Sequence, residues 1–273
     1  MYCYQDVIKG SATGGGRIQV NNFTVEVKPI ADPDNPGYMT CHATVTSLQG
    51  KIVYEQNDWG MEIDPITGKD VNGDGQPDAV LVGFSGGAHC CWTYHFISLG
   101  EKPGLIREFE NRAPASFSEL RGDGQVEILI SDGDYDFGFG LNHALSVFPL
   151  LIVQLRGSTF KDAGTKFWPV YDKKIWQQHD KLNTQQLHDF LHPIRNEPYD
   201  DSYLNTKSSV LLIALDYLYS GRSNEAKAIL GQFWPPDSRE QTWEEMLRGY
   251  CSGVRASLGV DLDPPCRITG QFK

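Results

Sequence analysis

The stretch DVNGDGQPDAVLVGF, residues 70–84, joins an acidic turn to a short apolar run. The run that begins at Ala79 is aliphatic and is bounded by turn residues, which is typical of a β-strand. Gly73 and Gly75 lower the steric cost of a tight bend just before it. The stretch therefore predicts a strand that begins directly at the end of an acidic turn.

A second copy of this pattern follows 49 residues later. Aligning DVNGDGQPDAVLV (70–82) with ELRGDGQVEILIS (119–131) matches Gly-Asp-Gly-Gln in both copies. Asp78 and Glu127 hold equivalent positions, each at the start of an apolar run. A repeat of about 50 residues has the size of one β-propeller blade. The repeat therefore favours a propeller-like arrangement of strands, with a sandwich-like arrangement as the alternative.

The rest of the first 173 residues also has the alternating pattern of β-strands. RIQVNNFTVEVKPI (17–30) alternates apolar and polar residues, and TCHATVTSLQGKIVYEQ (40–56) predicts two strands joined at Gln49-Gly50. Further strands are predicted over DAVLVGF (78–84), CWTYHFISL (91–99), LIREFE (105–110) and VEILIS (126–131). Short strands at this spacing indicate an all-β module. We expect it to cover residues 1–173.

From about residue 174 the apolar pattern becomes helical. SSVLLIALDYLYSG (208–221) places leucines on one helical stripe, and Gly221 is a residue type that ends helices. Other helices are predicted around TQQLHDFL (184–191), after Ser223 as a cap, and after a capping box of Ser238 and Gln241. The last helix would bury Trp243, Met246, Leu247, Tyr250, Val254 and Leu258. The expected fold class is α+β, with an α-helical domain over residues 174–273.

Composition limits the kind of partner. The chain has 35 Asp and Glu residues against 24 Lys and Arg, which gives a net charge of −11. Nucleic-acid binding proteins concentrate basic residues to neutralise phosphates, and no basic tract is present, so no nucleic acid partner is expected. An acidic chain instead suits cations or a basic protein.

No segment predicts a membrane span. The most apolar run, ALSVFPLLIVQL (144–155), is too short to cross a bilayer and contains Pro149. The first ten residues lack the basic and apolar regions of a signal peptide. The six cysteines form an even set, which disulfides would pair. We favour a periplasmic or secreted protein whose signal peptide has been removed, because the acid-rich turn suits calcium-rich conditions outside the cytoplasm. Cys251 and Cys266 are candidates to pair. A cytosolic protein with free thiols is the alternative.

The first turn has the spacing of a calcium loop. Calcium takes about six to eight oxygen ligands, which one tight turn can supply from alternate positions. The candidate ligands are the side chains of Asp70, Asn72, Asp74 and Asp78 and the main-chain carbonyl of Gln76. An EF-hand is excluded, because its last ligand is a glutamate where this chain has Leu81 in an apolar run. The alternative is a turn closed only by its own side-chain hydrogen bonds.

The pattern D-x-N-x-D-G-x-x-D, running into a strand, resembles the FG-GAP or VCBS-type repeat of integrin α-subunit propellers and of many exported bacterial proteins. The resemblance implies a calcium ion bound by the same five residues, Asp70, Asn72, Asp74, Gln76 and Asp78. It covers residues 70–82 well and residues 119–131 in part, because Arg121 stands where a ligand is needed. We expect no calcium at the second copy, with Arg121 either pointing away or pairing with a nearby acid.

Two other groups of residues could carry chemistry. SGGAHCC (85–91) resembles a motif of exported bacterial proteins of uncertain role, and its His89, Cys90 and Cys91 could supply a cysteine nucleophile. The same residues together with His95 could instead bind zinc, but adjacent cysteines rarely both bind one zinc ion. A tight structural corner between two strands is the simpler interpretation. Farther along, Asp132, Asp134 and Asp136 could form an acidic site, for which a solvated loop is the simpler interpretation.

Together these patterns predict an exported, non-enzymatic, calcium-stabilised module that binds another protein. One version is a periplasmic immunity or inhibitor-type protein that neutralises a basic effector. A hydrolase is one alternative, built on the His89/Cys90/Cys91 corner or on the Asp132–Asp136 loop. A carbohydrate or cell-wall binding protein is another, with Trp92, Trp168 and Trp176 as binding residues. Aromatic residues at such positions are more often buried.

Overall fold

A computed structural model describes residues 2–6, 11–87, 90–193, 200–260 and 266 of the chain. Contacts between residues divide the chain into two units. Unit 1 contains residues 1–128 and 154–160, and unit 2 contains residues 129–153 and 161–273. The chain therefore leaves unit 1, returns to it for one hairpin, and leaves it again. The boundary expected at residue 173 remains a prediction from sequence.

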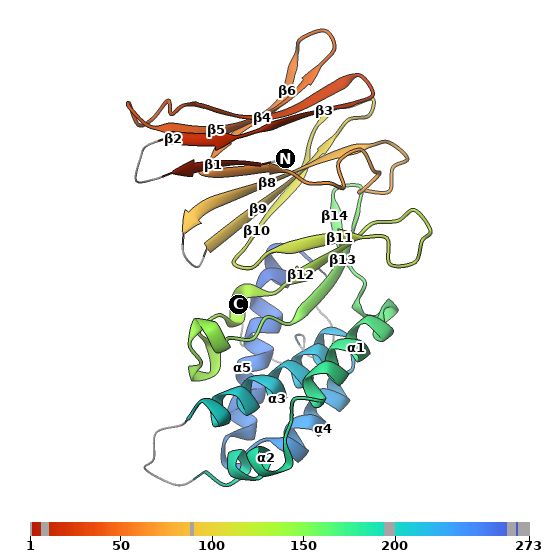
Figure 1. Ribbon diagram of the computed structural model, residues 1–273. Helices are drawn as coiled ribbons and strands as arrows, with labels where there is room; N and C mark the ends of the chain where they lie inside the picture. The colour runs from red at the N-terminus through yellow and green to blue at the C-terminus, as the bar shows by residue number, and fades with distance from the viewer. Residues whose placement is uncertain (1, 7–10, 88–89, 194–199, 261–265, 267–273) are drawn as a thin grey trace. The chain divides into compact units, whose positions relative to one another are not determined.

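The larger sheet of unit 1 has six strands in the order β10-β9-β8-β7-β1-β2 (Figure 1). Each strand is antiparallel to its neighbours. The strands are β1 (Tyr2–Asp6), β2 (Ser11–Gly14), β7 (Gly60–Ile63), β8 (Asp78–Gly87), β9 (Cys90–Ser98) and β10 (Gly104–Asn111). The strands predicted over residues 78–84, 91–99 and 105–110 are therefore confirmed, and the first acidic turn leads directly into β8.

The second sheet of unit 1 has the order β3-β4-β5-β6. Its strands are β3 (Gly16–Val20), β4 (Phe23–Ala31), β5 (Met39–Ser47) and β6 (Ile52–Asp58), with the predicted turn at Gln49-Gly50 between the last two. Alternate residues of these strands share one core with the larger sheet, as shown by Val25, Val45, Met61 and Leu81. A disulfide between Cys3 of β1 and Cys41 of β5 also joins the two sheets.

The third sheet has the order β11-β12-β13-β14. Its strands are β11 (Ala115–Ser118), β12 (Glu127–Ser131), β13 (Leu150–Arg156) and β14 (Thr159–Asp162). β12 follows the second acidic turn as β8 follows the first. The described strands form open sheets, without a closed barrel or propeller. The chain is α+β, with sheets mostly in its N-terminal part and helices toward its C-terminus, as predicted.

The helices of unit 2 are α1 (Trp168–His179), α2 (Thr184–Leu191), α3 (Asp201–Tyr219), α4 (Ser223–Phe233), α5 (Arg239–Ser252) and α6 (Val254–Ser257). α3 lies against α1, α2 and α4 (Figure 1). The predicted helices over residues 184–191 and 208–221 are α2 and the later part of α3. Gly221 follows α3 with a left-handed backbone, φ 78°, which is the conformation that ends helices at glycine.

One predicted helix cap is wrong and another is confirmed in position only. Ser223 is the first residue of α4, and Arg222 occupies the capping position. Ser238 occupies the capping position of α5 as predicted, but its side chain makes no capping hydrogen bond; its hydroxyl accepts a hydrogen bond from Nε1 of Trp234 (3.1 Å). The apolar residues predicted for the last helix, Trp243, Met246, Leu247, Tyr250, Val254 and Leu258, are all buried, but the helix divides at Gly253 into α5 and α6.

Candidate functional site

The first acidic turn, residues 70–78, closes through its own side chains. Asp70 accepts hydrogen bonds from the backbone N–H groups of Gly73 (2.7 Å), Asp74 (3.1 Å) and Gly75 (2.8 Å). Asn72 accepts one from the Asp74 N–H and donates one to Asp74 Oδ2 (3.1 Å). Gly73 and Gly75 allow the chain to wrap in this way because both have positive φ, 76° and 84°. The turn therefore orients its acidic side chains by local bonds alone.

Asp78 ends the turn and is fully buried, with 0% of its surface exposed. Its Oδ2 accepts hydrogen bonds from the N–H groups of Val71 (2.8 Å) and Asn72 (3.1 Å), but its Oδ1 has no partner within the described ranges. Burial raises the pKa of Asp78 to about 7; the two N–H groups oppose this shift, and the charges of Asp74 and Asp70 add to it. A buried carboxylate oxygen without a partner is costly, so a cation there would be favourable.

The five predicted calcium ligands lie together in this one turn between β7 and β8. Two of them are not carboxylates, because Asn72 offers an amide oxygen and Gln76 a main-chain carbonyl. In the part of the chain that the structure describes, no group of three His, Cys, Asp or Glu side chains is arranged to hold a metal ion. The hydrogen bonds are those of the self-closed turn that was the alternative. Calcium binding stays a prediction.

The second acidic turn, residues 119–127, has a similar backbone and a different end. Gly122 and Gly124 have φ of 66° and 81°, close to the values of the first turn. Glu127, which is fully buried, accepts the Leu120 N–H at Oε2 (2.9 Å), as Asp78 accepts the Val71 N–H. Its Oε1 accepts a hydrogen bond from the side-chain amide of Gln154 (2.6 Å). The protein therefore satisfies both oxygens of this carboxylate.

Arg156, at the end of β13, contacts both turns within unit 1. Its guanidinium donates to Oε1 of Gln125 in the second turn. In the first turn, a Cβ added to Gly73 would lie 2.6 Å from Nη1 of Arg156, so the guanidinium packs directly on this glycine. The next residue, Gly157, donates its N–H to the carbonyl of Asn72 (2.9 Å). The end of β13 therefore links the two turns.

Gln154 and Arg156 are neighbours of the turns that the sequence patterns above do not predict. The sequence does contain a signal, because Gln154 interrupts the apolar run LLIVQL (150–155). A glutamine in a strand that is otherwise buried needs a hydrogen-bond partner. Nothing in the sequence indicates that this partner is Glu127, 27 residues earlier.

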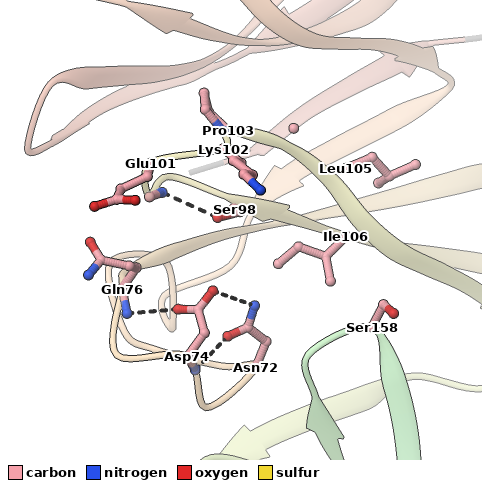
Figure 2. Close-up of a pocket in the computed structure, with 12 residues that line it drawn as sticks. Asn72, Asp74, Gln76, Ser98, Glu101, Lys102, Pro103, Leu105, Ile106 and Ser158 are labelled. Atoms are coloured by element: carbon pink, nitrogen blue, oxygen red, sulfur yellow. Dashed lines mark hydrogen bonds between the residues drawn. The ribbon is translucent and has the colours of Figure 1, made fainter.

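A cavity of about 640 Å³ lies beside the first turn, within unit 1 (Figure 2). Asn72, Asp74 and Gln76 line one wall. The rest of the lining comes from residues 98–106, which join β9 to β10, and from Ser158 between β13 and β14. The polar side of the turn therefore faces a space large enough for a small ligand.

The third acidic stretch lies in unit 2 and forms a short 3-10 helix, Gly133–Tyr135. It is neither a strand nor a solvated loop. Asp132 is fully buried, and the Tyr219 hydroxyl donates to its Oδ2 (2.5 Å). The other two carboxylates have separate partners: the backbone N–H of Val254 for Asp134, and Nδ1 of His143 (2.8 Å) for Asp136. The expected solvated loop is therefore wrong, and these acids connect separate segments of unit 2.

The cysteine corner provides no free thiol at Cys91, which is disulfide-bonded. His89 and the side chain of Cys90 lie outside the described residues, so a nucleophile at those two positions stays a prediction. Cys251 and Cys266 form a disulfide with an S–S distance of 2.05 Å, as predicted.

The three tryptophans proposed for carbohydrate binding differ in exposure. Trp92 is half-buried and its ring lies 5.0 Å from that of Phe84, measured between ring centroids. Trp168 and Trp176 of α1 are 48% and 67% exposed. Trp92 belongs to unit 1, and Trp168 and Trp176 belong to unit 2.

No protein-family model, curated protein or solved structure matches this chain. None of the described helices is long and apolar enough to cross a membrane. We therefore infer function from the geometry of the first turn and the cavity beside it.

Proposed function

We propose that the protein is an exported, non-enzymatic binding module that calcium stabilises and whose partner is another protein. The observation that supports the ion site most directly is the partnerless Oδ1 of the buried Asp78. In the second turn, the neutral amide of Gln154 donates a hydrogen bond to the corresponding oxygen of Glu127. A cation at the first turn would satisfy the Asp78 oxygen and offset the repulsion among the acids of the turn.

The chemical types of the residues in the first turn suit a calcium ion. It would be held by the side chains of Asp70, Asn72, Asp74 and Asp78 and by the main-chain carbonyl of Gln76. All five groups are oxygen ligands, which calcium prefers. The resemblance of the turn to FG-GAP or VCBS-type repeats supports the same set. That support concerns the turn alone, because the described strands form open sheets.

Calcium titration by calorimetry, together with thermal unfolding, tests the ion site. We expect one calcium ion per chain and a higher unfolding midpoint in calcium than in chelator, since a ligand that binds only the folded state stabilises it. Asp78→Asn should abolish both effects, because it removes the charge at the buried end of the turn.

Glu127→Gln is the matched control for Asp78→Asn. It changes the equivalent acid of the second turn and should leave calcium binding unchanged. Calcium binding that persists in Asp78→Asn, or is absent from the wild-type protein, would show that the first turn is not an ion site.

Charge and disulfides support the remaining parts of the proposal. A net charge of −11 favours a basic partner, and we propose a basic effector protein outside the cytoplasm. The disulfides Cys3–Cys41 and Cys251–Cys266 are typical of an oxidising compartment. The immobilised protein should capture a basic protein from a periplasmic extract in calcium, and less of it in chelator or at high salt. Capture of only acidic proteins, or equal capture in all conditions, would contradict this version.

A further inference from the structure

The cavity beside the first turn combines polar and apolar walls. Ser98 and Ser158 contribute hydroxyl groups, and Leu105 and Ile106 contribute aliphatic surface (Figure 2). The Ser98 hydroxyl accepts a hydrogen bond from the Gly100 N–H (3.2 Å), which leaves its O–H able to donate. Donors together with an aliphatic wall suit an organic ligand better than an inorganic ion.

The turn supplies fewer ligands than calcium normally takes. It offers five groups, and with one oxygen from each, calcium, which coordinates about six to eight oxygens, would take at least one more from outside the turn. Asn72 and Asp74 line the cavity, but the fully buried Asp78 does not. The cavity is therefore the side from which an outside oxygen can reach the ion.

Lys102 adds a second positive charge to the same cavity. It is exposed, and no ion pair is found for it within the described ranges. Figure 2 shows its amine directed into the space between the turn and β10, while the carboxylate of Glu101 points the opposite way. With calcium bound, the cavity would lie between a divalent ion and an ammonium group, which together attract an anion.

We propose that this cavity binds a carboxylate group in a calcium-dependent way. One carboxylate oxygen completes the coordination of the ion, Lys102 donates to the other, and the carbon skeleton packs on Leu105 and Ile106. The inference depends on the calcium site of the proposed function and adds the chemistry of the ligand to it. The carboxylate could belong to an acidic side chain of the protein partner or to an acidic saccharide.

Calorimetry with four small organic probes, and with inorganic phosphate for comparison, tests the inference on the full chain. N-acetyl-aspartyl amide represents the protein side chain, and glucuronate represents the saccharide. N-acetyl-asparaginyl amide and glucose are their neutral counterparts. We expect at least one acid to bind in calcium, its neutral counterpart to bind at least about tenfold more weakly, and neither acid to bind in chelator. Which acid binds identifies the source of the carboxylate. Binding of neither acid, equal binding in chelator, or tighter binding of inorganic phosphate would overturn the inference.

Lys102→Met and Lys51→Met provide a matched pair of variants. Both lysines are exposed and lie in unit 1, but only Lys102 lines the cavity. Lys102→Met should weaken carboxylate binding at least about tenfold and leave calcium binding unchanged, whereas Lys51→Met should change neither. Equal carboxylate binding by both variants would overturn the role of Lys102. If the wild-type protein binds no calcium, the proposed function fails. If it binds calcium but no carboxylate, only the further inference fails.

Discussion

The two acidic turns, residues 70–78 and 119–127, share a backbone and differ in what completes them. In each turn, two glycines adopt positive φ and the last acid accepts a backbone N–H from seven residues earlier. In each turn, an aspartate also accepts the N–H of a following glutamine, Asp74 from Gln76 and Asp123 from Gln125. The repeated sequence therefore specifies the path of the chain in both places.

The difference lies at the last acid of each turn. Glu127 receives the amide of Gln154 from β13, whereas Oδ1 of Asp78 has no partner in the described part of the chain. One turn is completed by a protein side chain, and the other has a buried carboxylate oxygen with no partner among the described residues. Similar turns can therefore have different chemistry, because a neighbouring strand decides which polar groups are satisfied.

The largest effect is expected from Glu127→Ala. The substitution removes the acceptor of the Leu120 N–H, leaves the Gln154 amide only its longer bond to Gln125 (3.4 Å), and creates a cavity in a fully buried place. It should lower the free energy of unfolding by about 4 kcal/mol. Urea denaturation in calcium and in chelator should show the same loss. A loss that depends on calcium would contradict the conclusion that protein groups alone complete the second turn.

The dependence of stability on pH should distinguish the two turns next. Burial raises the pKa of Asp78 to about 7 from 3.8, so without calcium the folded chain keeps a proton that the unfolded chain releases. The contribution of this proton to the free energy of unfolding is complete below about pH 4 and is lost as pH rises through about 7. In chelator, the wild-type free energy of unfolding should fall relative to Asp78→Asn by up to about 1.4 kcal/mol per pH unit in this window.

Excess calcium should reduce this pH dependence, because the ion favours the ionised carboxylate. Asp132 and Asp216 of unit 2 also have raised pKa values, of about 7 and about 6, caused first by burial. The comparison with Asp78→Asn removes their contribution, since it is the same in both proteins. Identical pH profiles for the two proteins would show that Asp78 ionises normally.

The variants Gly73→Ala and Gly122→Ala test the backbone conformation that the two turns share. Both glycines have positive φ, 76° and 66°, so alanine should cost about 1 kcal/mol at either position. At Gly73 the new Cβ would also lie 2.6 Å from Nη1 of Arg156, whereas nothing lies within 4 Å at Gly122. Because the end of an arginine can move, the extra loss at Gly73 should be only about 0.5 kcal/mol. Urea denaturation measures both, and adding Arg156→Ala to each variant should remove the difference.

The smallest effect is expected from Arg121→Asn, which gives the second turn the residue type of Asn72. The amide of Gln154 still binds Glu127 in this variant, so no second ion site should form. Calorimetry should still give one calcium ion per chain, and stability should change by less than about 0.5 kcal/mol. A second calcium ion would show that ligand spacing outweighs the neighbouring strand.

Local patterns predicted the parts of this molecule that depend on neighbouring residues. The alternation in residues 17–30 and 40–56 predicted β3 to β6; alternate residues of β4 and β5 are buried, and those of β3 are partly buried. In the same way, the helical period of residues 208–221 predicted the end of α3. The capping pattern predicted the position of Ser238 before α5 but not its hydrogen bond, because the hydroxyl accepts from Trp234 and makes no capping bond. A propeller was suggested by the repeat length, but repeat length does not determine strand order.

The sequence by itself determined both acidic turns, since their glycines and acids lie within nine residues of one another and bond locally. Only the tertiary structure decided that Gln154 completes the second turn, that Arg156 packs on Gly73, and that Lys102 faces Asp74 across a cavity. These groups come from distant strands and loops, whose positions depend on how the sheets pack. The opening stretch therefore encodes a turn closed by its own acids and glycines, and the fold leaves Oδ1 of Asp78 without a partner in the described part of the chain.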